Sequence, residues 1–251
     1  MSESGGNTGP GECFLGPLAA TIEGSGPPVV LLHGNGEDRS LFDGMAPWLV
    51  EAGFTVIRLD SRGHGLSPRG GCPMSLTQFA VDTARALTAY RRLTGWAGRF
   101  GVVGFSDGAN VALELALHRP SELAGQVLMG GNRRPGVVRP AVHAGLWAGF
   151  AVLGLEALFN GGARRRFDQW RVMMGQPLVR LADLRGMAVP SLVMAGAWDV
   201  VPRRESLLVA RTVPCGEWVQ IQGAGHMVPV QRPVVAATLA GAFLHKCLDV
   251  K

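Results

Sequence analysis

The chain has 251 residues, of which 47% are apolar and 17% are charged. These proportions predict one domain, or one domain with an insertion, and exclude general disorder. The formal charge of +5 comes almost entirely from arginine, since Lys246 and Lys251 are the two lysines, and no basic stripe is interleaved with aromatic residues. We therefore expect no nucleic-acid partner.

Residues 1–12 read MSESGGNTGPGE and lack the basic and apolar segments of a secretory signal. We expect a flexible tail over residues 1–17 and a cytoplasmic protein. The longest apolar run, 141–159, contains His143 and Glu156 and is short for a membrane span, so we expect no membrane partner. The four cysteines lie far apart and form no CxxC pair, which argues against a metal site and a disulfide framework.

Short apolar runs that end at turn residues predict strands, in chain order, at 29–32, 54–59, 100–104, 126–129, 191–195 and 218–221. Such continuous runs are typical of strands covered on both faces in a parallel sheet. Helical patterns separate them at 76–94, 109–118, 203–212 and 233–247. The alternation predicts an α/β fold with helices on both faces of a mostly parallel sheet.

The segment 132–185 interrupts this alternation. It contains no clear strand, only helical stretches rich in Arg, Trp, Phe and Met, and it lies between two predicted strands. We expect a helical excursion that covers the carboxyl edge of the sheet, where ligand chemistry gathers in such folds.

The stretch GFSDG, residues 104–108, follows the third predicted strand and opens a helix. A strand that turns sharply into a helix would expose the Ser106 hydroxyl, and side chains at 104 and 108 would collide with neighbouring chain. Alone, this pattern is as typical of an ordinary glycine turn as of a nucleophile. The strand before it and the helix after it favour a nucleophile.

A serine nucleophile needs a base, and the base needs an orienting carboxylate. Asp199 and His226 each directly follow a predicted strand, so they belong at the same edge of the sheet as Ser106. The chain order Ser106, Asp199, His226 matches the order known for this arrangement.

The chain resembles the α/β-hydrolase superfamily from about Leu18 onward. Five motifs carry the resemblance: VVLLHGNG (29–36), DSRGHGLS (60–67), GFSDGAN (104–110), PSLVMAGAWDVVP (190–202) and GAGHMVPVQRP (223–233). The resemblance implies Ser106 as nucleophile, Asp199 as acid and His226 as base. It also implies a core of residues 18–131 and 186–251, a helical cap over 132–185, and no cofactor or metal.

By the same resemblance, the oxyanion hole consists of the backbone N–H groups of Asn35 and Asp107. For the Asp107 side chain we favour a structural role at the helix start over a catalytic one. Asp60 is expected to organise the turn Ser61–Ser67, and would be a spare acid only if Asp199 failed. His33 and His64, in glycine-rich turns, are expected to brace loops.

Most cap aromatics are expected to serve ordinary packing, but a subset is a candidate apolar substrate pocket. The candidates are Trp147, Phe150, Phe167, Trp170 and Met173. The cap arginines, including the run 164–166, are either a solvated face or a clamp for a carboxylate or phosphate.

These features predict a cofactor-independent serine hydrolase that cleaves a small ester, thioester or lactone through an acyl-enzyme, as a monomer or homodimer. A haloalkane dehalogenase is set aside, because it needs an aspartate where Ser106 stands. A carbon–carbon bond hydrolase, a perhydrolase, an acyltransferase and a slow-turnover small-molecule receptor remain alternatives, since fold and triad do not separate them.

Overall fold

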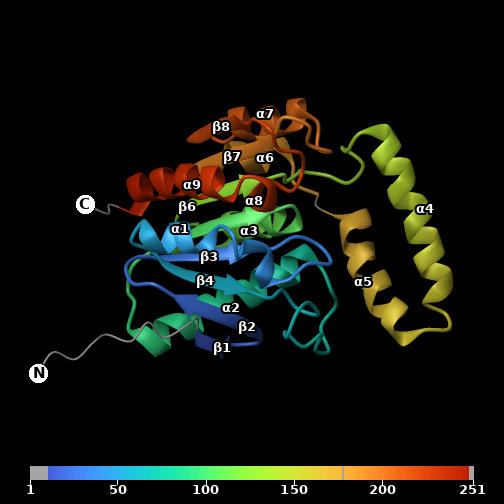
Figure 1. The fold of residues 1–251 in the computed structure, drawn as a ribbon, viewed down its shortest axis with the longest axis horizontal. Helices are drawn as coiled ribbons and strands as arrows, with labels where there is room; N and C mark the ends of the chain where they lie inside the picture. The colour runs from blue at the N-terminus through green and yellow to red at the C-terminus, as the bar shows by residue number, and fades with distance from the viewer. Residues whose placement is uncertain (1–10, 177, 249–251) are drawn as a thin grey trace, which may run out of the picture.

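An eight-stranded sheet runs through the molecule in the order β1-β2-β4-β3-β5-β6-β7-β8 (Figure 1). The computed structural model describes residues 11–176 and 178–248. Its strands are β1 (Gly11–Leu15), β2 (Leu18–Glu23), β3 (Pro28–Leu32), β4 (Thr55–Leu59), β5 (Phe100–Phe105), β6 (Leu123–Met129), β7 (Ser191–Gly196) and β8 (Gly216–Ile221). Strands β4, β3, β5, β6, β7 and β8 pair in parallel, whereas β2 is antiparallel to both of its neighbours.

All six expected strands are present, with ends within three residues of the prediction. Every residue of β3, β4, β5, β6 and β7 is buried. This confirms that the continuous apolar runs mark strands covered on both faces, and with them the predicted mostly parallel α/β architecture.

The tail expected over residues 1–17 is wrong for its described part, because Gly11–Leu15 forms strand β1. β1 pairs with β2 across Gly16, whose φ is +59°, a conformation that glycine adopts without strain. Leu15 and Leu18, at the two sides of this turn, are 2% exposed. Burial of these side chains fixes the hairpin to the sheet, while residues 1–10 lie outside the described part of the chain.

Helices cover both faces of the sheet, and each layer has its own apolar core. One layer contains α2 (Leu76–Thr94), α3 (Asp107–His118), α6 (Leu181–Arg185) and α7 (Arg203–Thr212); the other contains α1 (Ala46–Glu51), α8 (Val228–Gln231) and α9 (Pro233–Leu248). The longest of them, α2, begins where the Ser75 side chain accepts a hydrogen bond from the Gln78 N–H. It ends at Gly95, whose φ of +73° terminates the helical hydrogen bonding.

The segment between β6 and β7 contains α4 (Pro140–Glu156) and α5 (Gly161–Gly175), which stand together at one end of the sheet (Figure 1). α5 is fixed to the core: Arg69 pairs with Asp168 at 2.8 Å, and Gln169 Nε2 donates to the carbonyl of Gly63 at 3.1 Å. α4 packs on α5 and has no buried residue within it. The third helix of the segment, α6, packs instead against α7, and its Leu184 is fully buried.

No helix within residues 11–176 and 178–248 is both long and apolar enough to cross a membrane.

Candidate functional site

Ser106 lies at the sharp turn between β5 and α3. It has φ of 51°, and it is the one non-glycine residue with positive φ in the described part of the chain. A Cβ at Gly104 would run into the Gly108 backbone, and one at Gly108 would run into the backbone of β3. The two glycines therefore permit a strained turn that a larger residue at either position would prevent, as the motif predicted.

The structure brings Ser106, Asp199 and His226 together in one chain of hydrogen bonds. His226 Nε2 lies 3.2 Å from Ser106 Oγ, and His226 Nδ1 lies 2.8 Å from Asp199 Oδ1. Because an ionised carboxylate only accepts hydrogen bonds, the ring proton sits on Nδ1 and Nε2 is left to accept from the serine hydroxyl. The arrangement can remove a proton from Ser106 and hold it on the imidazole.

Asp199 and His226 are held in place by their surroundings. Asp199 is 3% exposed, and its Oδ1 also accepts a hydrogen bond from the Val201 N–H at 2.9 Å. The imidazole packs on the Phe105 ring at a centroid distance of 5.0 Å. On its other side a Cβ at Gly130 would come within 2.8 Å of the ring, so only glycine leaves room there.

Asp107 follows the serine in the first turn of α3, and Asn35 follows Gly34, whose added Cβ would lie 3.0 Å from Ser106 Cβ, in the loop after β3. Among the described residues neither backbone N–H has a hydrogen-bond acceptor, although both lie in a folded part of the chain. Free N–H groups beside a nucleophile are what an oxyanion hole requires.

The Asp107 carboxylate does not cap its own helix. Its Oδ2 accepts a hydrogen bond from Asn35 Nδ2 at 3.1 Å, and its Oδ1 accepts one from Asn110 Nδ2 at 3.2 Å. Burial raises the pKa of Asp107 to about 6, while the two amides and the nearby His226 hold it lower than burial alone would. The expectation that Asp107 caps the helix is therefore wrong, whereas its place in the first turn, at the positive end of the helix dipole, is as expected, and the contact with the Asn35 loop is additional.

A cavity of about 180 Å³ lies against Ser106 and His226. Its remaining walls come from the start of α3, the turn after β6, the loop into α4, the helices α4 and α5 and the loop before α7: Asp107, Gly130, Asn132, Pro135, Gly136, Val138, Val142, His143, Leu146, Met173, Met174, Val200 and Val201. The wall is mainly apolar, so this conformation accommodates a small apolar group beside the hydroxyl.

Of the five candidate pocket residues, Met173 lines this cavity. The others serve the contact between α4 and α5: Phe150 stacks on Phe167 at 4.7 Å, Trp147 meets Phe150 edge-on at 5.9 Å, and Trp170 faces Gly149. Val142 and Leu146 were not expected in the cavity wall, because which face of α4 turns toward the serine depends on how that helix packs.

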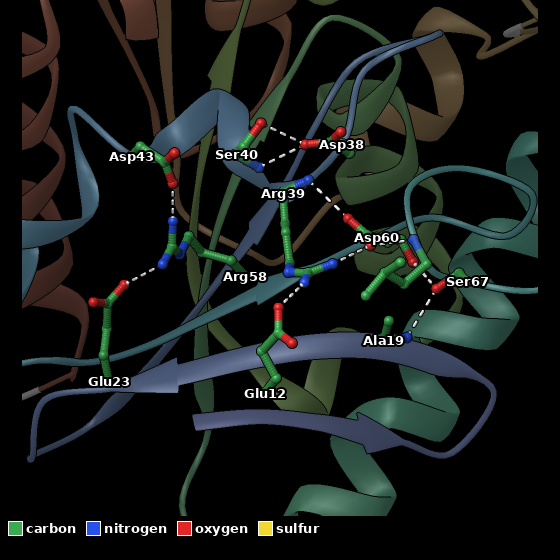
Figure 2. Close-up of polar contacts among 11 residues, drawn as sticks. Glu12, Ala19, Glu23, Asp38, Arg39, Ser40, Asp43, Arg58, Asp60 and Ser67 are labelled. Atoms are coloured by element: carbon green, nitrogen blue, oxygen red, sulfur yellow. Dashed lines mark hydrogen bonds and ion pairs between the residues drawn. The ribbon is translucent and has the colours of Figure 1, made fainter. Parts of the chain in front are cut away.

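Asp60 organises the turn Ser61–Ser67, as expected (Figure 2). Its carboxylate is fully buried, accepts hydrogen bonds from the backbone N–H groups of Leu66 and Arg39, and forms an ion pair with the Arg39 guanidinium. Asp60 is thus fully engaged in bracing this turn, whereas Asp199 is the acid that contacts His226.

His33 and His64 also have the bracing roles expected of them. His33 Nε2 accepts a hydrogen bond from the Ser61 N–H at 2.9 Å, and burial lowers the pKa of His33 to about 4. His64 packs against the ring of His33 at 5.2 Å, and burial lowers its pKa as well. Both rings stay neutral at physiological pH.

Within the described residues, no three His, Cys, Asp or Glu side chains are grouped so as to hold a metal ion.

Comparison with known proteins identifies the family. The sequence profile described as alpha/beta hydrolase fold matches residues 27–173, more than half of the chain. This chain belongs to the α/β-hydrolase family. A relative from Methylococcus capsulatus, pimeloyl-[acyl-carrier protein] methyl ester esterase, is 38% identical over 92% of this chain and 89% of its own length. The pyrrolizixenacetamide deacetylase of Xenorhabdus hominickii is 24% identical over 89% of this chain and 92% of its own.

Solved structures of other α/β-hydrolases superpose on the whole fold. A thermophilic esterase from Thermogutta terrifontis has a TM-score of 0.73 at 23% identity, covering 92% of this chain and 94% of that one. A meta-cleavage product hydrolase from Pseudomonas fluorescens IP01 has a TM-score of 0.73 at 19% identity, covering 94% and 98%. At such identities the likeness concerns the fold alone.

Proposed function

We propose that the protein is a cofactor-independent serine hydrolase that cleaves an ester through an acyl-enzyme intermediate. One observation carries the proposal: Ser106, His226 and Asp199 form a continuous chain of hydrogen bonds at the carboxyl edge of the sheet. The esterase and deacetylase relatives support a hydrolytic reaction.

In the proposed reaction, Ser106 Oγ attacks the ester carbonyl while His226 Nε2 takes its proton. Asp199 keeps the imidazole in the required tautomer and stabilises its charged form. Its Oδ2 is buried and accepts no hydrogen bond from any described residue, so the carboxylate is satisfied through Oδ1 alone, by His226 and by the Val201 N–H. His226 then protonates the leaving alcohol, and water releases the acyl group by the same route in reverse.

The N–H groups of Asn35 and Asp107 would stabilise the oxyanion of each tetrahedral intermediate. In this role they would bind a charge that develops only in the transition state, so they would raise kcat more than they lower KM. Loss of one such donor reduces kcat by about 100- to 1000-fold in serine hydrolases.

The test is a Ser106→Ala variant combined with a fluorophosphonate probe and intact-mass analysis. We expect the wild-type protein to gain one probe adduct, located on Ser106, and to turn over short-chain esters continuously. Ser106→Ala should take up no probe and lose turnover. Full turnover by Ser106→Ala would defeat the proposal, and a single burst of product without further turnover would favour the slow receptor instead.

A second feature favours anionic esters among the substrates. Residues 132–185 hold nine arginines and three acidic residues, so this segment is more positive than the chain as a whole. An open cavity of about 660 Å³ is lined by Arg134, Arg139 and Arg204, none of which forms an ion pair with a described residue. It shares Pro135, Gly136 and Val138 with the cavity beside Ser106.

We infer that a carboxylate or phosphate at the far end of the ester lies among these arginines. Methyl esters of a dicarboxylate and of a monocarboxylate of equal length should differ in KM, and Arg134→Gln with Arg139→Gln should abolish the difference. Unchanged KM values in the double variant would remove this inference.

A further inference from the structure

We propose that the Asp107 side chain is a positioning group for the oxyanion hole: it holds the Asn35 loop so that the Asn35 N–H faces the reacting carbonyl. The inference rests on the proposed function. The Asp107 carboxylate has no role in the proton transfers among Ser106, His226 and Asp199. Asp107 thereby contributes to the site twice, with its own N–H and through the placement of the second N–H.

The loop Gly34–Glu37 is held by contacts to α3 and α5 and by one hydrogen bond within the loop itself. Both N–H protons of the Asn35 amide are used, one on Asp107 Oδ2 at 3.1 Å and one on the carbonyl of Gln169 in α5 at 2.8 Å. The Gly34 N–H donates to Glu37 Oε2 at 3.0 Å. Since a Cβ at Gly34 would lie 3.0 Å from Ser106 Cβ, the loop passes directly beside the nucleophile.

Asp107 is itself rigidly anchored. Its second oxygen accepts from Asn110 Nδ2, and Asn110 in turn is tied to Asn132, whose N–H donates to Asn110 Oδ1 at 3.0 Å. The carboxylate therefore links the loop after β3 to α3 and to the loop after β6. A shift of Asn35 would break a hydrogen bond to a buried charged group, which is costly.

Burial of the charged Asp107 carboxylate lowers the stability of the folded protein. Asp107 is 7% exposed, and its pKa is raised to about 6. His226 and Glu37 are the other titratable groups with an electrostatic influence across the site, and burial raises the pKa of Glu37 too. If the side chain at position 107 only filled space, an uncharged residue there would make the fold more stable.

The first test compares kcat and KM in Asp107→Ala, Asn35→Ala and the double variant. Asn35→Ala keeps its backbone N–H and loses both hydrogen bonds of the side-chain amide, the one to Asp107 and the one to the Gln169 carbonyl. A donor displaced by about 1 Å costs up to about 100-fold in rate, so we expect each single variant to lose about 10- to 100-fold in kcat, with KM within about threefold of the wild type. The double variant should lose clearly less than the product of the two single losses, because both single variants remove the hydrogen bond between Asn35 and Asp107.

Asp107→Asn is the conservative variant, since it keeps one oxygen that can accept from Asn35. It should recover at least about tenfold in kcat over Asp107→Ala. Asn110→Ala is the matched control: it removes the other hydrogen bond to the carboxylate, and its larger effect should be on the free energy of unfolding.

Fluorophosphonate uptake separates this inference from the proposed function. Each variant should still reach one adduct on Ser106, though more slowly, because its nucleophile is intact. Three results would each overturn the positioning role. The losses of the two single variants could multiply in the double variant, or Asp107→Ala could keep the wild-type kcat. The third such result is an Asp107→Asn variant that is as slow as Asp107→Ala. Ester turnover by Ser106→Ala would instead overturn the reaction itself.

Discussion

The titration of Asp107 gives a direct physical test of its burial. The carboxyl group has a pKa of about 6 in the folded protein, against 3.8 for a solvated aspartate, and desolvation is the largest cause. Between these two values the folded state binds more protons than the unfolded state. Stability therefore falls as the pH rises from about 4 to about 6, and the contribution is lost above that range.

The size of the effect follows from the difference between the two pKa values. At about 1.4 kcal/mol for each tenfold change in the proton equilibrium, the wild-type protein loses about 3 kcal/mol through this group between pH 4 and pH 7. Asp107→Asn does not titrate. The hydrogen bonds altered by the substitution change the free energy of unfolding by the same amount at each pH. The burial of charge is therefore measured by how the difference in free energy between variant and wild type changes with pH.

The assay is urea unfolding of the wild-type protein and Asp107→Asn at several pH values from 4 to 7. The free energy of unfolding of the variant minus that of the wild type should rise by about 3 kcal/mol across the range. Asp183→Asn is the control, because its hydrogen bond with Arg180 lowers the pKa of the partly buried Asp183 below 3.8, so its difference from the wild type should not rise between pH 4 and pH 7. If the difference in the free energy of unfolding between Asp107→Asn and the wild type did not change with pH, it would refute the conclusion that burial of the Asp107 charge destabilises the fold.

Three further substitutions test separate parts of the structure. Asp199→Asn keeps the shape of the acid but favours the wrong tautomer of His226, so kcat should fall by about 10⁴-fold in an ester assay. Gly130→Ala places a Cβ 2.8 Å from the imidazole at a residue with φ of +63°, so steady-state kinetics should show a fall in kcat of about 100-fold. Asp82→Ala leaves the buried Arg62, whose Nε now donates to Asp82 at 2.6 Å, without its partner, and should lower the free energy of unfolding by about 3 to 5 kcal/mol in urea.

The sheet could be predicted from the sequence because its inner strands are buried on both faces and read as continuous apolar runs. Strand β1 could not: Gly11–Leu15 is short, half-exposed and at the sheet edge, and burial of Leu15 with Leu18 is decided by the strand's partner. Local propensity carries little information in such a strand.

The positions of Ser106, Asp199 and His226 could be predicted for a topological reason. Each follows a strand of the parallel part of the sheet, and parallel strands deliver their carboxyl ends to one edge. No such topological rule applies to the segment between β6 and β7. Tertiary contacts determine which faces of α4 and α5 are turned toward the site. For this reason Phe150 and Phe167 face each other while Met173 faces the serine.

The tie between Asn35 and Asp107 was also beyond reach of the sequence, since it joins side chains 72 positions apart and depends on how two loops approach. The loss of stability caused by the buried Asp107 carboxylate nevertheless points to a function for this hydrogen bond. A carboxylate that lowers the stability of the fold above pH 6 is retained at the turn that carries the nucleophile, and an uncharged residue there would relieve that loss. If Asp107 positions Asn35, Asp107→Ala must slow turnover even as it removes the buried charge, so stability and rate place opposite demands on this one side chain.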